Sequence, residues 1–247
     1  MSLRNRVALI TGGTRGIGKG IALGLAREGA RIAIVYRANK AAAQAALRQL
    51  QAVGADCVAV ETDITESARA DQLVKTVADR YGRLDVLVNN VGEFRWGTLA
   101  DSFVEEWTGI FESNVTTVFH MCHAALPAMR KGRWGRIINL GAVGAERAFG
   151  QAKISAYAAA KAAVVAMSRS LALEEAKNGI TVNVVNPSSI DEKDLTLEEA
   201  RKLKDARYPI GRPPTVDDVA AAVSFFASEE AEYVTGQVVN VSGGWML

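Results

Sequence analysis

Cysteine, histidine and net charge are all scarce in this sequence. Its 247 residues include two cysteines, Cys57 and Cys122, which are too few for a disulfide framework or a four-ligand zinc site. The 29 Lys and Arg nearly balance the 27 Asp and Glu, and a net charge of +2 gives no electrostatic reason to expect a nucleic-acid partner. His120 and His123 are three residues apart with no third ligand near them, so we expect them to pack and not to bind a metal.

Long hydrophobic runs are also missing. The longest apolar stretch, residues 156–173, is interrupted by Lys161 and Arg169, which makes it too polar to span a bilayer. The first six residues lead into only a short apolar run, so no signal peptide is expected. These absences predict a cytoplasmic protein with no membrane partner.

Short β-branched runs alternate with longer segments of helical periodicity, and no linker or repeat divides the chain. This pattern predicts a single α/β domain over residues 1–247, with a parallel sheet covered by helices on both faces. The seven candidate strands are residues 7–10, 31–36, 57–62, 84–88, 136–140, 180–185 and 237–241. The candidate helices are residues 16–28, 39–53 with an Asn39 cap, a helix capped by Thr65 or Ser67 that runs to Tyr81, 104–131 and 155–178.

Residues 188–208 break this alternation. The segment is rich in charge at residues 191–194 and then shows a helical pattern through residues 195–206. An insertion after the carboxyl end of a strand in such a sheet lies beside the ligand crevice. We therefore interpret it as a lid over the substrate, with a surface helix of no special role as the alternative.

A glycine-rich turn at residues 11–18 follows the first strand and opens the first helix. Glycine permits a tight turn and close backbone approach, and the helix N-terminus favours a phosphate. The spacing is not G-x-G-x-x-G, and a purely structural turn is the alternative. The residues expected to hold a dinucleotide here are Gly12, Thr14, Arg15, Gly16, Ile17 and Gly18.

The ends of the next strands suggest which dinucleotide binds. No acid for a ribose 2′-hydroxyl occurs in residues 31–40, whereas Arg15 and Arg37 suit a 2′-phosphate, which favours NADP (NADPH) over NAD. The alternative is that one or both arginines are solvated. Asp63, beside Ile64, follows the third strand and could accept a hydrogen bond from adenine or cap its own turn. The fourth strand ends in a run that could form the edge of the cofactor crevice, namely Asn90, Val91 and Gly92.

Tyr157 and Lys161 are four residues apart in a helical pattern and therefore share a face. A cation beside a phenol favours the phenolate, so we expect Lys161 to lower the pKa of Tyr157 and to make it a usable acid or base. Phe94 and Trp96 could line a substrate pocket or simply pack.

Together these motifs resemble the short-chain dehydrogenase/reductase family over essentially the whole chain, and most closely its 3-oxoacyl-carrier-protein reductase group. The carrying residues are 11–18, 89–92, 157–161, 186–187, 236–244 and Asn114. The resemblance implies a Rossmann-like, doubly wound sheet and a nicotinamide cofactor. It also implies hydride transfer between that cofactor and a small-molecule or acyl carbonyl substrate, in a homodimer or homotetramer.

The same resemblance implies roles for individual residues. Tyr157 would donate the proton, Lys161 would hold the nicotinamide ribose and tune Tyr157, and Asn114 would support a proton-relaying water. Pro187 and Ile190 would contact the nicotinamide end of the cofactor.

The chain departs from the family at the position of a serine that donates to the substrate oxygen, where Ala142 stands. Losing one such donor costs ~2.7–4 kcal/mol of transition-state stabilisation. The candidate replacement donors are Gln151, Lys153 and Ser188, because Ser155 faces away from Tyr157. A catalytically weak or silent NADP-binding subunit or sensor is therefore the alternative function.

Overall fold

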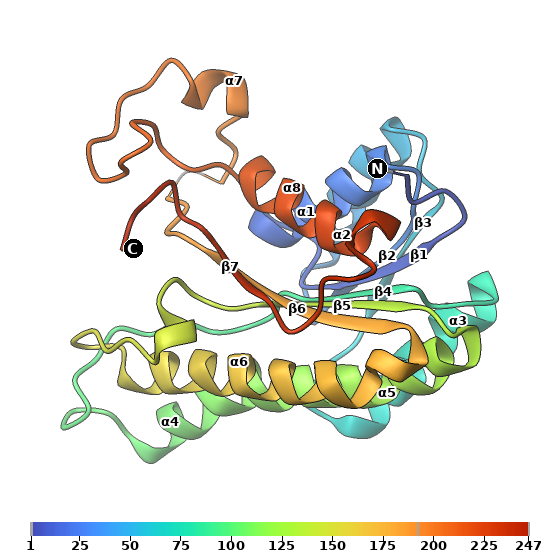
Figure 1. Ribbon diagram of the computed structural model, residues 1–247, viewed down its shortest axis with the longest axis horizontal. Coiled ribbons are helices and arrows are strands. Elements are labelled where there is room, and N and C mark those ends of the chain that lie inside the picture. The colour runs from blue at the N-terminus through green and yellow to red at the C-terminus, as the bar shows by residue number, and fades with distance from the viewer. Residues whose placement is uncertain (1, 192, 247) are drawn as a thin grey trace.

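The computed structural model describes residues 2–191 and 193–246, and these form one seven-stranded parallel sheet (Figure 1). Its order is β3-β2-β1-β4-β5-β6-β7, so the direction of winding reverses between β1 and β4. This doubly wound α/β arrangement confirms the predicted fold class. The strands are β1 Val7–Thr11, β2 Arg31–Tyr36, β3 Cys57–Glu61, β4 Val86–Asn89, β5 Gly135–Leu140, β6 Ile180–Pro187 and β7 Val238–Val241.

Helices cover both faces of the sheet, as Figure 1 shows. One layer contains α1 Gly16–Arg27, α2 Lys40–Ala52 and α8 Val216–Ala227, and the other contains α3 Ser67–Tyr81, α4 Val104–Phe111, α5 Thr117–Gly132 and α6 Ser155–Glu175. Glycine lets α1 and α8 approach closely, because a Cβ at Gly20 would lie 2.8 Å from the Val216 side chain. Among the described residues, no helix is both long enough and apolar enough to cross a bilayer.

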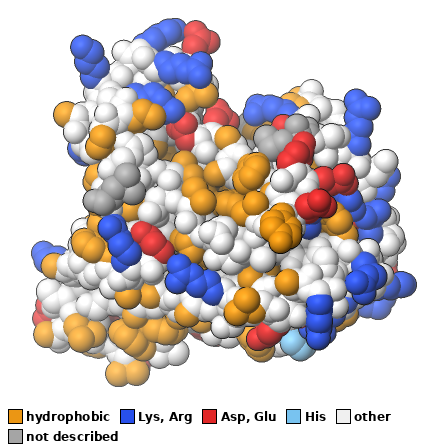
Figure 2. All heavy atoms as spheres, viewed as in Figure 1, with side chains coloured by type: hydrophobic (Ala, Val, Ile, Leu, Met, Phe, Trp, Pro, Cys, Tyr) orange, Lys and Arg blue, Asp and Glu red, His pale blue; other side chains and the backbone are white. Residues whose placement is uncertain are grey.

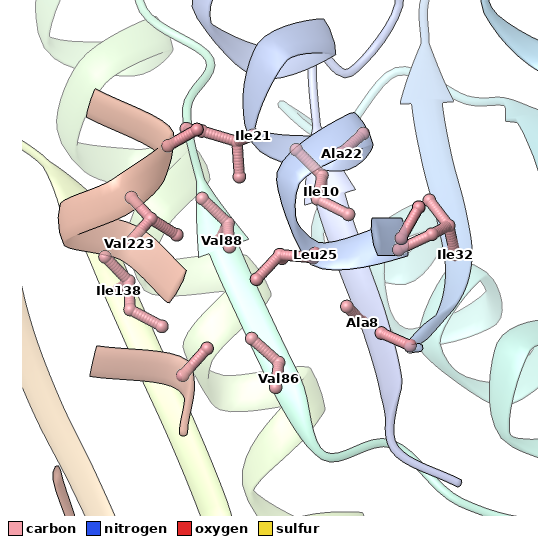
Figure 3. Close-up of a cluster of buried hydrophobic side chains, with 14 of the residues drawn as sticks. Ala8, Ile10, Ile21, Ala22, Leu25, Ile32, Val86, Val88, Ile138 and Val223 are labelled. Carbon is pink, nitrogen blue, oxygen red and sulfur yellow. The ribbon is translucent and has the colours of Figure 1, made fainter. Parts of the chain in front are cut away.

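The core lies between the sheet and each helix layer. In the cluster of Figure 3, Ile10, Val88 and Ile138 of the strands face Leu25 of α1 and Val223 of α8. All five side chains are fully buried. Burial on both faces explains why the strands are continuous apolar runs rather than alternating ones.

The first of the two long helices predicted from the sequence is not regular. Residues 104–131 form α4 and α5 with a π-helical turn, Glu112–Thr116, between them. Pro127 remains inside α5. At α2, the Asn39 side chain accepts a hydrogen bond from the Ala42 N–H, which confirms the predicted cap.

Two other local predictions were wrong. Neither Thr65 nor Ser67 caps α3, because Glu66 is its N-cap residue and the Thr65 hydroxyl donates to Asp63. The helix expected over residues 195–206 is limited to α7, Leu197–Ala200, and beyond it the chain closes shorter i→i−3 turns at Lys202 and Leu203. The part of segment 188–208 around α7 stands out from the body as a lobe with a hollow beside it (Figures 1 and 2), and Glu192 of this segment lies outside the described residues.

Candidate active site

A crevice of ≈ 540 Å³ opens at the carboxyl ends of the strands, where the winding direction reverses. Ligands bind at this position in doubly wound sheets. The crevice runs from the start of α1 to the first turns of α6. Its lining includes Gly12, Arg15, Gly16, Ile17, Gly18, Arg37, Asp63, Ile64, Asn90, Val91, Gly92, Tyr157, Lys161, Pro187 and Lys193.

The glycine-rich turn requires its glycines. Gly12 and Gly16 have φ of +64° and +52°, which other residues rarely adopt. A Cβ at Gly18 would lie 2.4 Å from the Gly12 carbonyl oxygen. Arg15 is the extended N-cap residue of α1, and its side chain makes no capping bond, so the positive end of the helix dipole faces the crevice without a built-in anion.

Asn90 positions this turn. Its Nδ2 donates to the Thr11 and Gly12 carbonyl oxygens at 3.0 and 3.3 Å. The Thr11 hydroxyl accepts from the backbone N–H groups of Asn90 and Val91 at 2.9 and 3.1 Å. The end of β4 is thereby fastened to the end of β1, and the polar groups of Asn90 hold the cradle that a phosphate would enter.

At the far end of the crevice, Arg15 and Arg37 are exposed at its rim. Asp63 accepts hydrogen bonds from the Thr65 N–H and hydroxyl at 3.1 and 2.8 Å, so it caps its own turn. Burial acts to raise the pKa of Asp63, but these bonds and the nearby Arg37 outweigh it and lower the pKa. The Ile64 carbonyl oxygen lies 3.2 Å from His120 Nδ1.

Lys161, Asn114 and Gly92 meet at the other end of the crevice. The buried Lys161 ammonium donates to the Leu140 carbonyl oxygen at 2.8 Å, and its Nζ lies 5.6 Å from the centre of the Tyr157 ring. A Cβ at Gly92 would lie 3.4 Å from Lys161 Nζ and 2.3 Å from Asn114 Oδ1. A Cβ here would clash with Asn114 Oδ1, so the approach of Asn114 requires a glycine, whereas the distance to Lys161 is an ordinary contact.

Burial dominates the protonation of the two central groups. It raises the pKa of the Tyr157 phenol to about 12 and lowers the pKa of the Lys161 ammonium to about 8. The expectation that the pKa of Tyr157 is lowered was therefore wrong, because desolvation of the half-buried phenol raises it. At neutral pH the phenol is neutral and holds the proton that a general acid must donate.

The π-helical turn places Asn114 behind Gly92, which lines the crevice; Asn114 itself is fully buried and is not among the described residues of that lining. Its Nδ2 donates to the carbonyl oxygens of Ile110 and Glu93 at 3.0 and 2.9 Å. Its Oδ1 is buried and has no hydrogen-bond partner among the described residues. A buried acceptor without a partner is costly unless a donor such as water reaches it.

Ala142 stands where a serine is expected, and the two hydroxyls that line the crevice near Tyr157 among the described residues do not supply the missing donor. Ser113 and Thr117 already donate to the carbonyl oxygens of Gly109 and Ser113, at 2.8 and 2.7 Å. Among the described residues that line the crevice, none of the three sequence candidates occurs: the side chains of Gln151 and Lys153 are exposed, and Ser188 is buried elsewhere.

Two predicted cofactor-binding residues, Ile190 and Thr14, are not among the described residues that line the crevice. Ile190 is buried in the core cluster beneath α1 and α8, and Thr14 is half-buried within the glycine-rich turn, so their contacts with a cofactor stay predictions. The Phe94 ring packs edge-on against Tyr157, with 4.9 Å between centroids, and against Trp96 at 5.3 Å. Of these three aromatic residues, Tyr157 lines the crevice, and Phe94 packs on it.

Sequence reasoning missed Glu146 and Lys193. The Glu146 carboxylate accepts from the side-chain amides of Asn186 and Asn240, both at 3.0 Å, and so fastens the loop after β5 to the ends of β6 and β7. Lys193 lines the crevice from segment 188–208. In the sequence, Glu146 is a single carboxylate in a loop and Lys193 is one cation within an acidic stretch. Neither pattern by itself indicates a functional residue. Among the described residues, no group of three His, Cys, Asp or Glu could hold a metal.

Comparisons with known proteins agree with this architecture. The family described as "Enoyl-(Acyl carrier protein) reductase" matches residues 12–246. The chain is 39% identical over 243 residues to the 3-oxoacyl-[acyl-carrier-protein] reductase FabG of Staphylococcus aureus, covering 97% of this chain and 98% of the relative. It is 40% identical over 250 residues to the FabG of Vibrio cholerae, with 100% of both chains covered.

A solved structure has a similar fold over nearly the whole chain. Acetoin dehydrogenase YohF from Salmonella typhimurium superposes with a TM-score of 0.89 at 32% identity, covering 98% of this chain and 96% of the other. Full-length similarity in sequence and in fold, together with the crevice and its Tyr157–Lys161 pair, leads to one conclusion: the chain belongs to the short-chain dehydrogenase/reductase family of oxidoreductases.

Proposed function

We propose that this protein is an NADP-dependent reductase that transfers a hydride between NADPH and a carbonyl or alcohol substrate, including substrates of the 3-oxoacyl type. The observation that carries the proposal is the neutral phenol of Tyr157, which lines the same crevice as the glycine-rich turn. The sequence similarity to 3-oxoacyl reductases and the structural similarity to an acetoin dehydrogenase both favour a carbonyl substrate.

The residues present fit a dinucleotide phosphate. The positive φ of Gly12 and Gly16 and the close approach of Gly18 to the Gly12 carbonyl oxygen make a tight turn that needs its glycines, and the first turn of α1 offers its N–H groups beside it. Arg15 and Arg37 at the rim would hold a 2′-phosphate, since guanidinium groups suit phosphate geometry. Asp63, Ile64, Asn90, Val91 and Pro187 would form the walls. When bound, the reduced nicotinamide would supply the hydride.

The chain's own residues would manage the proton. Tyr157 would donate its phenolic proton to the substrate oxygen as negative charge develops on it. Lys161, with a pKa lowered by burial to about 8, would hold the nicotinamide ribose and favour the transient phenolate. The unpartnered Asn114 Oδ1 would accept a hydrogen bond from a water that returns a proton to the site.

Because Ala142 stands at the position of the family's serine, a second function is also proposed, namely that of an NADP-binding homologue with weak or no catalysis. Removing one donor to a developing oxyanion lowers rates by ~10²–10³. The Ser113 and Thr117 hydroxyls donate to backbone carbonyls and do not supply that donor. Tyr157 would then stabilise the substrate oxygen alone.

A turnover assay separates the two functions. The protein is mixed with NADPH and a panel of ketones and β-keto esters while the absorbance of the reduced cofactor is followed. For a reductase, turnover is lost in Tyr157→Phe, which keeps the ring that packs against Phe94. NADPH binding without turnover of any substrate would support the silent homologue. Absence of NADPH binding would contradict both.

We also propose that the protein acts as a homodimer or homotetramer and that segment 188–208 closes over the substrate. The family resemblance supports the first, and the presence of Lys193 in the crevice wall supports the second. Light scattering gives the oligomeric state. Slower tryptic cleavage within residues 188–208 when NADPH and a substrate are present would support the closure.

A further inference from the structure

Segment 188–208 reaches the glycine-rich turn through the side chain of Lys193. A Cβ at Gly16 would lie 2.9 Å from Lys193 Cδ and 3.7 Å from its Cε, so the aliphatic stem of Lys193 crosses the Cα of Gly16. Next to this contact, the Lys19 ammonium of α1 lies 3.5 Å from the Asp194 carboxylate. Two neighbouring residues of the segment therefore rest on the first turns of α1.

The other charged residues that line the crevice give Lys193 no evident structural role. The lining carries four cations, Arg15, Arg37, Lys161 and Lys193, against the carboxylates of Asp63 and Glu93. Lys161 donates to a backbone carbonyl, and Arg37 lies close enough to Asp63 to lower the pKa of that carboxyl group. Within residues 2–191 and 193–246, no carboxylate pairs with the Lys193 ammonium.

The position along the crevice indicates which anion this ammonium would meet. Its stem is held at Gly16, the first residue of α1, where the helix dipole and free N–H groups favour a phosphate. Arg37 lies instead beyond the end of β2. A flexible ammonium works as a point charge and suits a diphosphate that already receives backbone N–H groups.

We propose that Lys193 is a phosphate-binding residue that contacts the pyrophosphate of the dinucleotide and thereby fastens segment 188–208 over the bound cofactor. This inference rests on the proposed NADP-binding function. It makes Lys193 a determinant of affinity for dinucleotides in general, whereas Arg37 determines the choice between NADPH and NADH. The ammonium contributes equally to the binding affinity for NADPH and for NADH, because both dinucleotides carry the pyrophosphate.

The test is a fluorescence titration of the full-length protein with NADPH and, separately, with NADH. Lys193→Met keeps the apolar stem on Gly16 and removes the charge, and Lys193→Arg keeps the charge. We expect Lys193→Met to bind both dinucleotides about tenfold more weakly, as the loss of one charge-assisted hydrogen bond predicts. Lys193→Arg is expected to bind within about threefold of wild type, since it retains the cation.

Two controls make the result specific. Lys202→Met removes an exposed ammonium from the same segment, where it pairs with Glu198 at 3.0 Å, and is expected to leave both affinities unchanged. Arg37→Ala is expected to weaken NADPH only. Because Lys193 is exposed, the thermal unfolding midpoint of Lys193→Met without nucleotide should match that of wild type.

The outcomes are distinguishable. Wild-type affinity of Lys193→Met for both dinucleotides would overturn this inference and leave the proposed function intact. A loss confined to NADPH would also overturn it, because the ammonium would then serve the 2′-phosphate. A wild-type protein that binds neither dinucleotide would overturn the proposed function, and this inference with it.

Discussion

Replacing Lys161 by methionine tests the energetics of the site in the protein without ligand. Lys161 is buried, with 5% of its surface exposed, and its ammonium donates a hydrogen bond to the Leu140 carbonyl oxygen. Burial lowers its pKa from 10.5 to about 8. The folded protein therefore holds a charged group in an environment that disfavours charge.

The size of this destabilisation follows from the thermodynamic linkage between proton binding and folding. Each unit of pKa corresponds to 1.36 kcal/mol, so the lowered pKa of Lys161 destabilises the fold by about 3 kcal/mol wherever the ammonium is protonated in both states. Between about pH 8 and pH 10.5 the unfolded chain binds more protons than the folded protein, and stability rises with pH. From about pH 7 to pH 9 the gain is about 1 kcal/mol.

The measurement is urea unfolding of wild type and Lys161→Met at these two pH values, at equal protein concentration and without nucleotide. Wild type is expected to gain about 1 kcal/mol over the variant on going to the higher pH. The variant removes the ammonium, its hydrogen bond to Leu140 and its titration together, so the comparison uses the change of the free energy of unfolding with pH and not its absolute value. Lys202→Met, which removes an exposed lysine, should retain the wild-type pH dependence. Identical pH dependence in wild type and Lys161→Met would refute the reasoning.

Three further substitutions test the site. Ala142→Ser should raise kcat about 10²-fold, because the serine restores a donor to the substrate oxygen. The control Ala159→Ser, at an exposed position of α6, should leave kcat unchanged. Equal kcat in the two variants would show that another group already supplies the donor. Gly92→Ala places a Cβ 2.3 Å from Asn114 Oδ1 and should lower the free energy of unfolding, measured with urea, by about 1–3 kcal/mol. The control Gly109→Ala has open space around its Cβ and should not lower it. An unchanged free energy of unfolding in Gly92→Ala would mean that Asn114 is free to move. Arg37→Ala should weaken NADPH binding about tenfold without changing NADH binding, and an equal loss for both would refute the 2′-phosphate assignment.

Local sequence patterns predicted much of the architecture. Apolar runs at β1, β2, β4 and β5 are buried on both faces, so their composition alone indicates a covered parallel sheet. The Asn39 cap and the glycine-rich turn depend on residues close together in the chain, and such signals can be read from sequence. The i, i+4 spacing of Tyr157 and Lys161 likewise brings them to one helix face.

Where local signals compete, the sequence was less informative. Residues 112–116 have an ordinary helical pattern, yet they form the π-helical turn that contains Asn114. Thr65 looks like a helix cap, but its hydroxyl donates to Asp63. Residues 201–206 have helical periodicity but close tighter turns after Ala200. In each case several hydrogen-bonding arrangements are available to the same short segment, and helical periodicity or cap preference does not specify which of them forms.

By itself, the sequence determined the alternation of strands and helices, the glycine-rich turn and the Tyr157–Lys161 pair, because each depends on neighbours within a few residues. Only the tertiary structure decided the protonation of that pair, since desolvation depends on what the whole fold packs around it. It also decided that Lys193 lies on Gly16 and that Glu146 bonds to Asn186 and Asn240. These residues are far apart in the chain, and no local pattern specifies their contacts.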